Sequence, residues 1–113
     1  MLKIYHNTRC KKSRAALLFL EQKGIDFQVI DYIKSSITKD DVQVILLKMN
    51  AKAEELLRTQ EPEFKKHCKG LSFTQPEWIR LICENPQMLK RPIVVGKYKA
   101  VIADPPEKIL EVL

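Results

Sequence analysis

The stretch Leu2-Lys3-Ile4-Tyr5-His6-Asn7-Thr8-Arg9-Cys10 begins a β-α-β unit and decides the fold of this chain. Leu2–His6 alternates apolar and polar residues weakly, as a short strand does, and Asn7–Arg9 interrupts that pattern as a loop. Over Cys10–Lys23 the apolar residues follow helical spacing, and Gly24 is typical of a helix C-terminus. The opening segment therefore predicts a strand, a loop and a helix in direct succession.

A second strand is predicted at Asp26–Tyr32, and a right-handed crossover makes it parallel to the first. The middle of the chain, about residues 37–88, carries helical signals and reads as an insertion between strands. Pro92–Val95 and Lys99–Ala103 then look like two strands joined by a hairpin at Gly96-Lys97, before a last helix that Asp104 caps. Two capping boxes are predicted, Thr38 with Asp41 and Thr74 with Glu77. The helical segments predicted in the insertion are Thr38–Leu47, Ala53–Leu57, Glu61–His67 and Thr74–Ile82.

The element order is therefore βαβ, then helices, then ββα. This order predicts an α/β chain of thioredoxin-like fold, with a four-stranded mixed sheet and an inserted helical lobe. The 113 residues, of which 45% are hydrophobic, fit a single domain over residues 1–113 that builds its core without disulfides.

Composition excludes several classes of function. No run approaches the roughly 18 uncharged apolar residues of a membrane span, and no signal-peptide core is present, so we expect a cytoplasmic protein without a membrane partner. The three cysteines, Cys10, Cys68 and Cys83, form neither a disulfide framework nor the close ligand pairs of a zinc site, so no metal is expected. The net charge of +6 favours a small anion or an acidic protein over nucleic acid, because few aromatic residues are interleaved with the basic ones.

Cys10 is the candidate reactive residue. It lies where a strand ends and a helix begins, and ligands bind at this end of strands in open α/β sheets. The free N–H groups and partial positive charge of a helix N-terminus stabilise a thiolate or an oxyanion, and the Ser13 hydroxyl can donate to the same anion. A small capping residue beside a solvated basic turn remains the alternative interpretation. The residues expected to favour the ionised sulfur by their charge are His6, Arg9, Lys11, Lys12 and Arg14.

The spacing around Cys10 sets two thiol chemistries aside. A redox dithiol requires Cys-x-x-Cys, but Ser13 stands at the second position. A phosphate-loop cysteine phosphatase resembles Cys followed by Arg at the sixth position, which is Ala16 here. The sequence therefore predicts a monothiol site.

Three ordered blocks resemble the glutaredoxin-linked arsenate reductases, the ArsC family. Tyr5–Arg14 is similar to their active-site motif, although Thr8 stands where a proline is usual. Leu56–Pro62 is similar to their second block, and Lys90–Val95, continuing to Pro105–Lys108, is similar to their third. The blocks are collinear and cover almost the whole chain, so the match is more specific than a single cysteine motif.

The resemblance implies a mechanism in which the Cys10 thiolate attacks the arsenic of arsenate. It implies glutathione as co-substrate, glutaredoxin as the protein partner that completes turnover, and no bound cofactor. Arg58 and Arg91 would hold the oxyanion, since guanidinium groups bind tetrahedral oxyanions bidentately. A surface ion pair for Arg58 and simple exposure for Arg91 are the alternatives. The other residues assigned are His6, Ser13 and Arg14 as catalytic, and Asn7 and Pro92, the latter a cis-proline, as substrate-binding.

One departure and two alternatives bear on the substrate. Asp104 stands where the family commonly has a third anion-binding arginine, and a carboxylate there disfavours an oxyanion. One alternative is a glutathione-dependent thiol reductase with another substrate. The other is a redox-sensing regulator that binds RNA polymerase. Cys68 and Cys83 are interpreted as buried structural thiols rather than resolving thiols.

Overall fold

The computed structural model describes residues 2–7, 9–68 and 70–113. The chain divides into two compact units, one formed by Met1–Ser35 with Arg91–Leu113 and the other by Ser36–Lys90. The second unit begins and ends close to the bounds of the predicted helical insertion, 37–88.

The first unit is built on a four-stranded sheet with the strand order β2-β1-β3-β4. Its strands are β1 (Leu2–His6), β2 (Phe27–Asp31), β3 (Ile93–Val95) and β4 (Ala100–Ile102). β1 pairs with β2 in parallel and with β3 antiparallel, and β3 pairs with β4 antiparallel. This confirms the predicted α/β fold with a mixed sheet of thioredoxin-like order.

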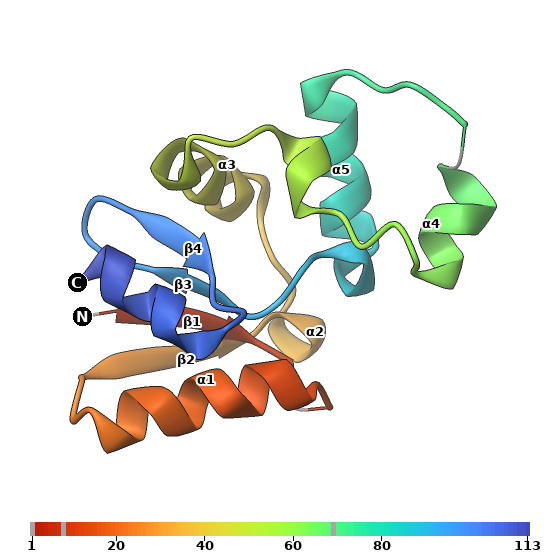
Figure 1. The fold of residues 1–113 in the computed structure, drawn as a ribbon. Helices are drawn as coiled ribbons and strands as arrows, with labels where there is room; N and C mark the ends of the chain where they lie inside the picture. The colour runs from red at the N-terminus through yellow and green to blue at the C-terminus, as the bar shows by residue number, and fades with distance from the viewer. Residues whose placement is uncertain (1, 8, 69) are drawn as a thin grey trace. The chain divides into compact units, whose positions relative to one another are not determined.

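Two helices pack on the same side of this sheet (Figure 1). They are α1 (Lys11–Gln22) and the 3₁₀ helix η3 (Pro106–Val112). Gly24 ends α1 with a φ of 66°, a left-handed conformation that suits glycine, as predicted. Each large apolar side chain buried in this core contributes roughly 1.5–3 kcal/mol. The buried core comprises Leu2, Ile4, Ala16, Leu20, Val94, Ala103, Ile109 and Val112.

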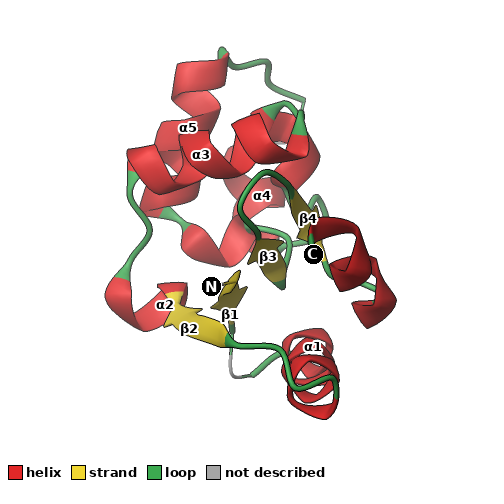
Figure 2. Ribbon diagram, turned by 90° about the vertical axis from the view of Figure 1, so that its left-hand side faces the viewer, coloured by secondary structure: helices red, strands yellow, loops and turns green. Residues whose placement is uncertain are grey.

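A short helix, α2 (Tyr32–Ser35), follows β2 directly and was not predicted (Figure 2). The Asp31 carboxylate accepts hydrogen bonds from the backbone N–H groups of Ile33 and Lys34, each at 3.2 Å. These bonds satisfy N–H donors at the start of the turn, so the strand ends one residue earlier than the apolar pattern indicates.

The elements of the second unit are α3 (Lys39–Met49), η1 (Ala53–Leu56), α4 (Pro62–His67), α5 (Gln75–Glu84) and η2 (Pro86–Met88). They include the four predicted helices, of which one, η1, is a 3₁₀ helix. Both predicted capping boxes are present: Thr38 and Asp41 begin α3, and Thr74 and Glu77 begin α5. The η2 turn was not predicted.

The core of the second unit is centred on Trp78 of α5. Phe64 stacks on its ring at a centroid distance of 6.3 Å, and Phe73 meets it edge-on at 4.7 Å. Leu57 and Leu89, both buried, form an antiparallel bridge that ties the chain after η1 to the chain after η2. The residues next to this bridge are therefore held by backbone pairing as well as by packing.

Asp104 does not cap the last helix, so that prediction is wrong. Pro105 occupies the N-cap position of η3, and no side chain caps it. The Asp104 carboxylate instead pairs with the Lys12 ammonium at 2.8 Å. The sequence cue failed because the partner comes from α1, about ninety residues away in the chain, which no local pattern shows.

Candidate active site

The loop between β1 and α1 is organised by Asn7. Its carbonyl oxygen accepts from the Cys10 N–H at 2.9 Å, and its side-chain Oδ1 accepts from the Arg9 N–H at 3.0 Å. The Asn7 N–H donates to the buried Ser13 Oγ at 3.4 Å. Asn7 thus uses its amide oxygen to shape the loop. Thr8, the substitution noted in the motif, lies outside the described residues.

Cys10 occupies the N-cap position of α1, with an extended backbone conformation (φ −96°, ψ 124°). Burial raises the pKa of its thiol, but hydrogen bonds to the sulfur outweigh burial and lower the pKa from 9.0 to about 7. The donors are the backbone N–H and hydroxyl of Ser13, the side chain of Arg91 and the backbone N–H of Lys12. A substantial share of Cys10 is therefore thiolate at neutral pH, which is the nucleophilic form.

The side chain of Arg91 donates a hydrogen bond to the Cys10 sulfur. Arg91 lies about eighty residues after Cys10 in the chain, just before β3. Its Nε and Nη1 atoms are buried and have no hydrogen-bond partner among the described residues. Buried donors without partners carry a desolvation penalty of about 1–3 kcal/mol, more when charged. A ligand that accepts hydrogen bonds and carries negative charge would satisfy both nitrogens.

Pro92 follows Arg91 through a cis peptide bond, which confirms the predicted cis-proline. Its side chain is buried, and its carbonyl oxygen accepts from the Ala103 N–H at 2.9 Å. This bond continues the β3–β4 pairing toward Arg91.

His6 is buried at the end of β1, with 4% of its surface exposed. Burial lowers its pKa below 6.5, Asp31 on the neighbouring strand raises it, and Arg14 lowers it further. His6 is therefore neutral at pH 7, and the expectation that it adds positive charge to the site is wrong. The physical reason is that burial in the sheet removes the water that stabilises an imidazolium. Its Nδ1 is buried without a hydrogen-bond partner in the part of the chain that is described.

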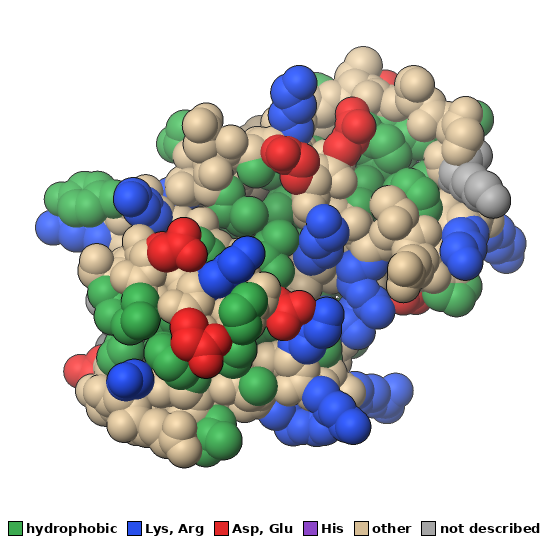
Figure 3. Space-filling model, viewed as in Figure 1, with side chains coloured by type: hydrophobic (Ala, Val, Ile, Leu, Met, Phe, Trp, Pro, Cys, Tyr) green, Lys and Arg blue, Asp and Glu red, His purple; other side chains and the backbone are tan. Residues whose placement is uncertain are grey.

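The cations of the first turn of α1 are exposed (Figure 3). Lys and Arg side chains gather over the N-terminal end of this helix, which has no acidic residue in its first turn. Positive side chains at a helix N-terminus are repelled by the positive end of the helix dipole, so these cations do not stabilise α1. Both the cations and the helix N-terminus would attract a bound anion. The charge of Arg14 lowers the pKa of His6, and the Lys12 ammonium forms an ion pair with Asp104. The groups that lower the pKa of Cys10 are hydrogen-bond donors rather than these flanking charges.

Arg58 lies in the second unit and is engaged by its own neighbours. Its Nη1 donates to Glu61 Oε2 at 3.0 Å and to the Gln87 carbonyl oxygen at 3.4 Å. The ion pair that the sequence left open as an alternative is therefore formed, and its partner is Glu61. Its role as a substrate-binding residue stays a prediction.

The other two cysteines differ from Cys10. Cys68 is buried, and burial raises the pKa of its thiol. Cys83 is only partly buried, contrary to its interpretation as a buried thiol, and burial again raises its pKa. Both are therefore protonated at neutral pH, which leaves Cys10 as the cysteine with an activated thiol among the three.

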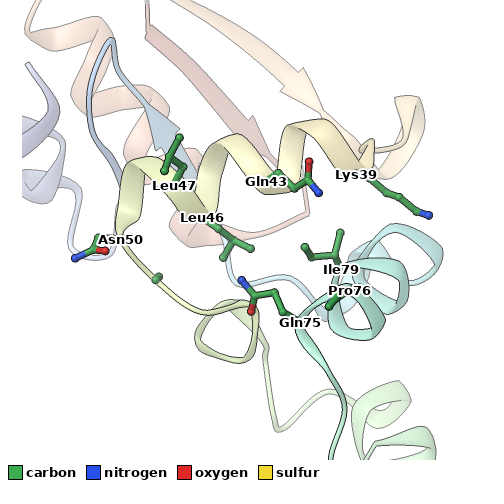
Figure 4. A pocket seen from close by; sticks show the side chains of 9 residues that line it. Lys39, Gln43, Leu46, Leu47, Asn50, Gln75, Pro76 and Ile79 are labelled. Carbon is green, nitrogen blue, oxygen red and sulfur yellow. The ribbon is translucent and has the colours of Figure 1, made fainter.

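The second unit also has a groove of about 630 Å³ that the sequence did not indicate. Figure 4 shows Gln43 and Leu46 of α3 facing Pro76 and Ile79 of α5 across it. The residues assigned to the site are not among those that line it, so the groove adds nothing to the thiol chemistry. Within residues 2–7, 9–68 and 70–113, no three His, Cys, Asp or Glu side chains form a group able to hold a metal ion, and no helix is long and apolar enough to cross a membrane.

The sequence profile of the ArsC family matches residues 5–112. The arsenate reductase of Haemophilus influenzae is 35% identical over 112 residues, covering 97% of this chain and 97% of that protein. The Escherichia coli protein named "Uncharacterized protein YfgD" is 36% identical over 115 residues, covering 99% and 96%. The structure of an arsenate reductase from Vibrio cholerae superimposes with a TM-score of 0.93 at 32% identity, covering 99% of this chain and 97% of that one. The chain therefore belongs to the ArsC family.

Proposed function

We propose that this protein is a monothiol oxidoreductase of a reducing compartment such as the cytoplasm, and that Cys10 reduces arsenate with glutathione and glutaredoxin as the source of electrons. One observation carries the proposal. The Cys10 thiol has a pKa of about 7, and the guanidinium that helps to lower it has two buried nitrogens without partners. A nucleophilic sulfur beside unsatisfied cationic donors suits a tetrahedral oxyanion as the electrophile. Relatives named arsenate reductase over nearly the full chain support arsenate as that oxyanion.

The covalent step forms a bond between the Cys10 sulfur and arsenic. An arsenate oxygen leaves as water once it has taken up protons, and arsenic remains in its pentavalent state. Arg91 stabilises the negative charge of the adduct, while the Ser13 and Lys12 N–H groups hold the sulfur at the start of α1. His6 is a neutral imidazole during this step. Asn7 holds the loop conformation because its Oδ1 accepts a hydrogen bond from the Arg9 N–H.

Reduction requires two electrons, which two glutathione thiols supply. Each arsenate consumed then yields one arsenite, one water and one glutathione disulfide, and the Cys10 thiol is regenerated. Glutaredoxin resolves the mixed disulfide between glutathione and protein or substrate. Arg58 is proposed as a second substrate-binding cation on the family resemblance alone.

The test is arsenate-dependent oxidation of NADPH by the purified protein with glutathione, glutaredoxin and glutathione reductase. Wild-type protein should turn over, and Cys10→Ser should lose turnover while keeping its circular dichroism spectrum and melting temperature. Cys83→Ser is the matched control, because it removes a partly exposed thiol of raised pKa, and it should retain activity. Absence of turnover with rapid alkylation of Cys10 at neutral pH would contradict arsenate as the substrate and leave the thiol site in place.

A further inference from the structure

Arg58 is held through one nitrogen of its guanidinium. Both acceptors of its side chain, Glu61 Oε2 and the Gln87 carbonyl oxygen, are bonded to Nη1. Among the residues that the structure describes, Nε and Nη2 make no hydrogen bond or ion pair. These two nitrogens lie along one edge of the planar guanidinium, and that edge can donate two parallel hydrogen bonds to an oxyanion.

The backbone around Arg58 is fixed by pairing within the second unit. The Arg58 N–H donates to the Met88 carbonyl at 2.7 Å, next to the bridge between Leu57 and Leu89. The Glu61 N–H donates to the Arg58 carbonyl at 3.0 Å, which closes a turn and brings the two side chains together. The Cα of Arg58 therefore has a defined position, and the remaining freedom of the residue lies in its long side chain.

Glu61 restricts that side-chain freedom. The Arg58–Glu61 pair is partly desolvated, with side-chain exposures of 36% and 20%. A second Arg–Glu pair in the same unit, Arg80–Glu84, has the same kind of contact at 2.9 Å but exposures of 72% and 54%. Partial burial makes the first pair less screened by water and better able to hold one conformation.

We propose that Glu61 is a positioning residue that locks Arg58 through Nη1, so that its Nε–Nη2 edge is preset to bind a tetrahedral oxyanion. The inference rests on the proposed function, in which Arg58 binds the oxyanion substrate. A guanidinium ordered in advance loses less conformational freedom when the anion binds, which improves affinity without a new contact. The carboxylate itself does not touch the ligand.

The experiment measures the dissociation constant of arsenate by calorimetry in the Cys10→Ser protein, where the covalent step cannot proceed. Adding Glu61→Ala should weaken arsenate binding by about twofold to tenfold, the range for ordering one long side chain. Glu61→Gln keeps an oxygen that can accept from Nη1 and should retain the affinity. Glu84→Ala, which removes the carboxylate of the exposed pair, should leave the affinity unchanged. Thermal unfolding of each variant verifies that it is folded.

A second background shows whether Glu61 acts through Arg58. In a protein that already carries Arg58→Ala, the further change Glu61→Ala should have no effect on arsenate affinity. An equal loss in both backgrounds would overturn the proposal, as would a loss in Glu61→Gln as large as that in Glu61→Ala. Arsenate binding that is unchanged or tighter in Glu61→Ala would also overturn it, since Glu61 would then be a bystander or a competing anion.

The failure of this inference can be told from the failure of the proposed function. If Arg58→Ala weakens arsenate binding and Glu61→Ala does not, the positioning role alone is wrong. If the Cys10→Ser protein binds no arsenate, the proposed function and the positioning role fail together.

Discussion

Replacement of Arg91 by methionine is expected to slow the reaction of Cys10 with alkylating reagents at neutral pH. With a pKa of about 7 instead of 9.0, Cys10 is about half thiolate at pH 7, where an ordinary thiol is about 1% thiolate. A thiolate of lower pKa is also a weaker nucleophile, by roughly eightfold for this shift at a Brønsted coefficient of about 0.45. The two effects leave Cys10 about sixfold faster than an ordinary thiol at pH 7.

Arg91→Met removes one of the donors that lower this pKa, while the donors from Ser13 and Lys12 remain. We therefore expect the pKa of Cys10 to rise by about 1 unit and not to reach 9.0, the ordinary value of a free thiol. The thiolate share at pH 7 then falls from about one half to about one tenth. Because two buried guanidinium nitrogens are lost as well, arsenate-dependent turnover should fall more steeply than alkylation.

The assay is the rate of iodoacetamide alkylation from about pH 5 to about pH 10, together with the ultraviolet absorbance of the thiolate. Burial raises the pKa of Cys68 and of Cys83, so the transition near pH 7 reports Cys10 alone. Arg80→Met is the matched control, because it removes an exposed guanidinium of the second unit. A wild-type transition near pH 9, or an unchanged transition in Arg91→Met, would refute the reasoning.

Two further changes test the surroundings of Cys10. Burial lowers the pKa of His6, so the unfolded state binds the proton more readily than the folded state. The contribution of His6 to the unfolding free energy is therefore fully present above about pH 6.5 and is lost as the pH falls below that value. Thermal melts over this range should show that loss in wild type and less of it in His6→Gln; equal slopes would contradict a buried neutral histidine. Asp104→Arg should tighten arsenate binding in the Cys10→Ser protein, and an unchanged affinity would show that Asp104 faces away from the anion. Because the Lys12–Asp104 pair is exposed (63% and 41%), the same change should alter the unfolding free energy by only about 0–1 kcal/mol.

Local signals in the sequence predicted most of the elements. The capping boxes at Thr38 and Thr74 and the left-handed residue Gly24 are decided by hydrogen bonds and backbone conformations within a few residues. They therefore appear where the sequence places them. The order of the elements then predicted the mixed sheet, because a parallel crossover and a hairpin leave few arrangements of four strands.

Elements that depend on a single side chain or on distant partners were predicted less well. The Asp31 carboxylate turns the end of β2 into the short helix α2, although the apolar pattern continues past it. Asp104 carries the signature of a helix cap but finds Lys12 on another helix. Asp31 bonds to backbone N–H groups two and three residues further along the chain, whereas the partner of Asp104 was selected by the tertiary structure.

The sequence by itself determined the fold, the position of Cys10 at a strand-to-helix turn and the family. The reason is that element order, helix starts and motif blocks depend on residues that are close together in the chain. Only the tertiary structure decided which distant groups act on the site and how far its residues are buried. It brings Arg91 to Cys10 and leaves two of its nitrogens without partners, and it buries His6 so that it is neutral. The pKa of Cys10 depends on its chain neighbours Ser13 and Lys12 but also on Arg91, and the pKa of His6 depends on burial. Burial and distant contacts cannot be read from neighbours in the chain.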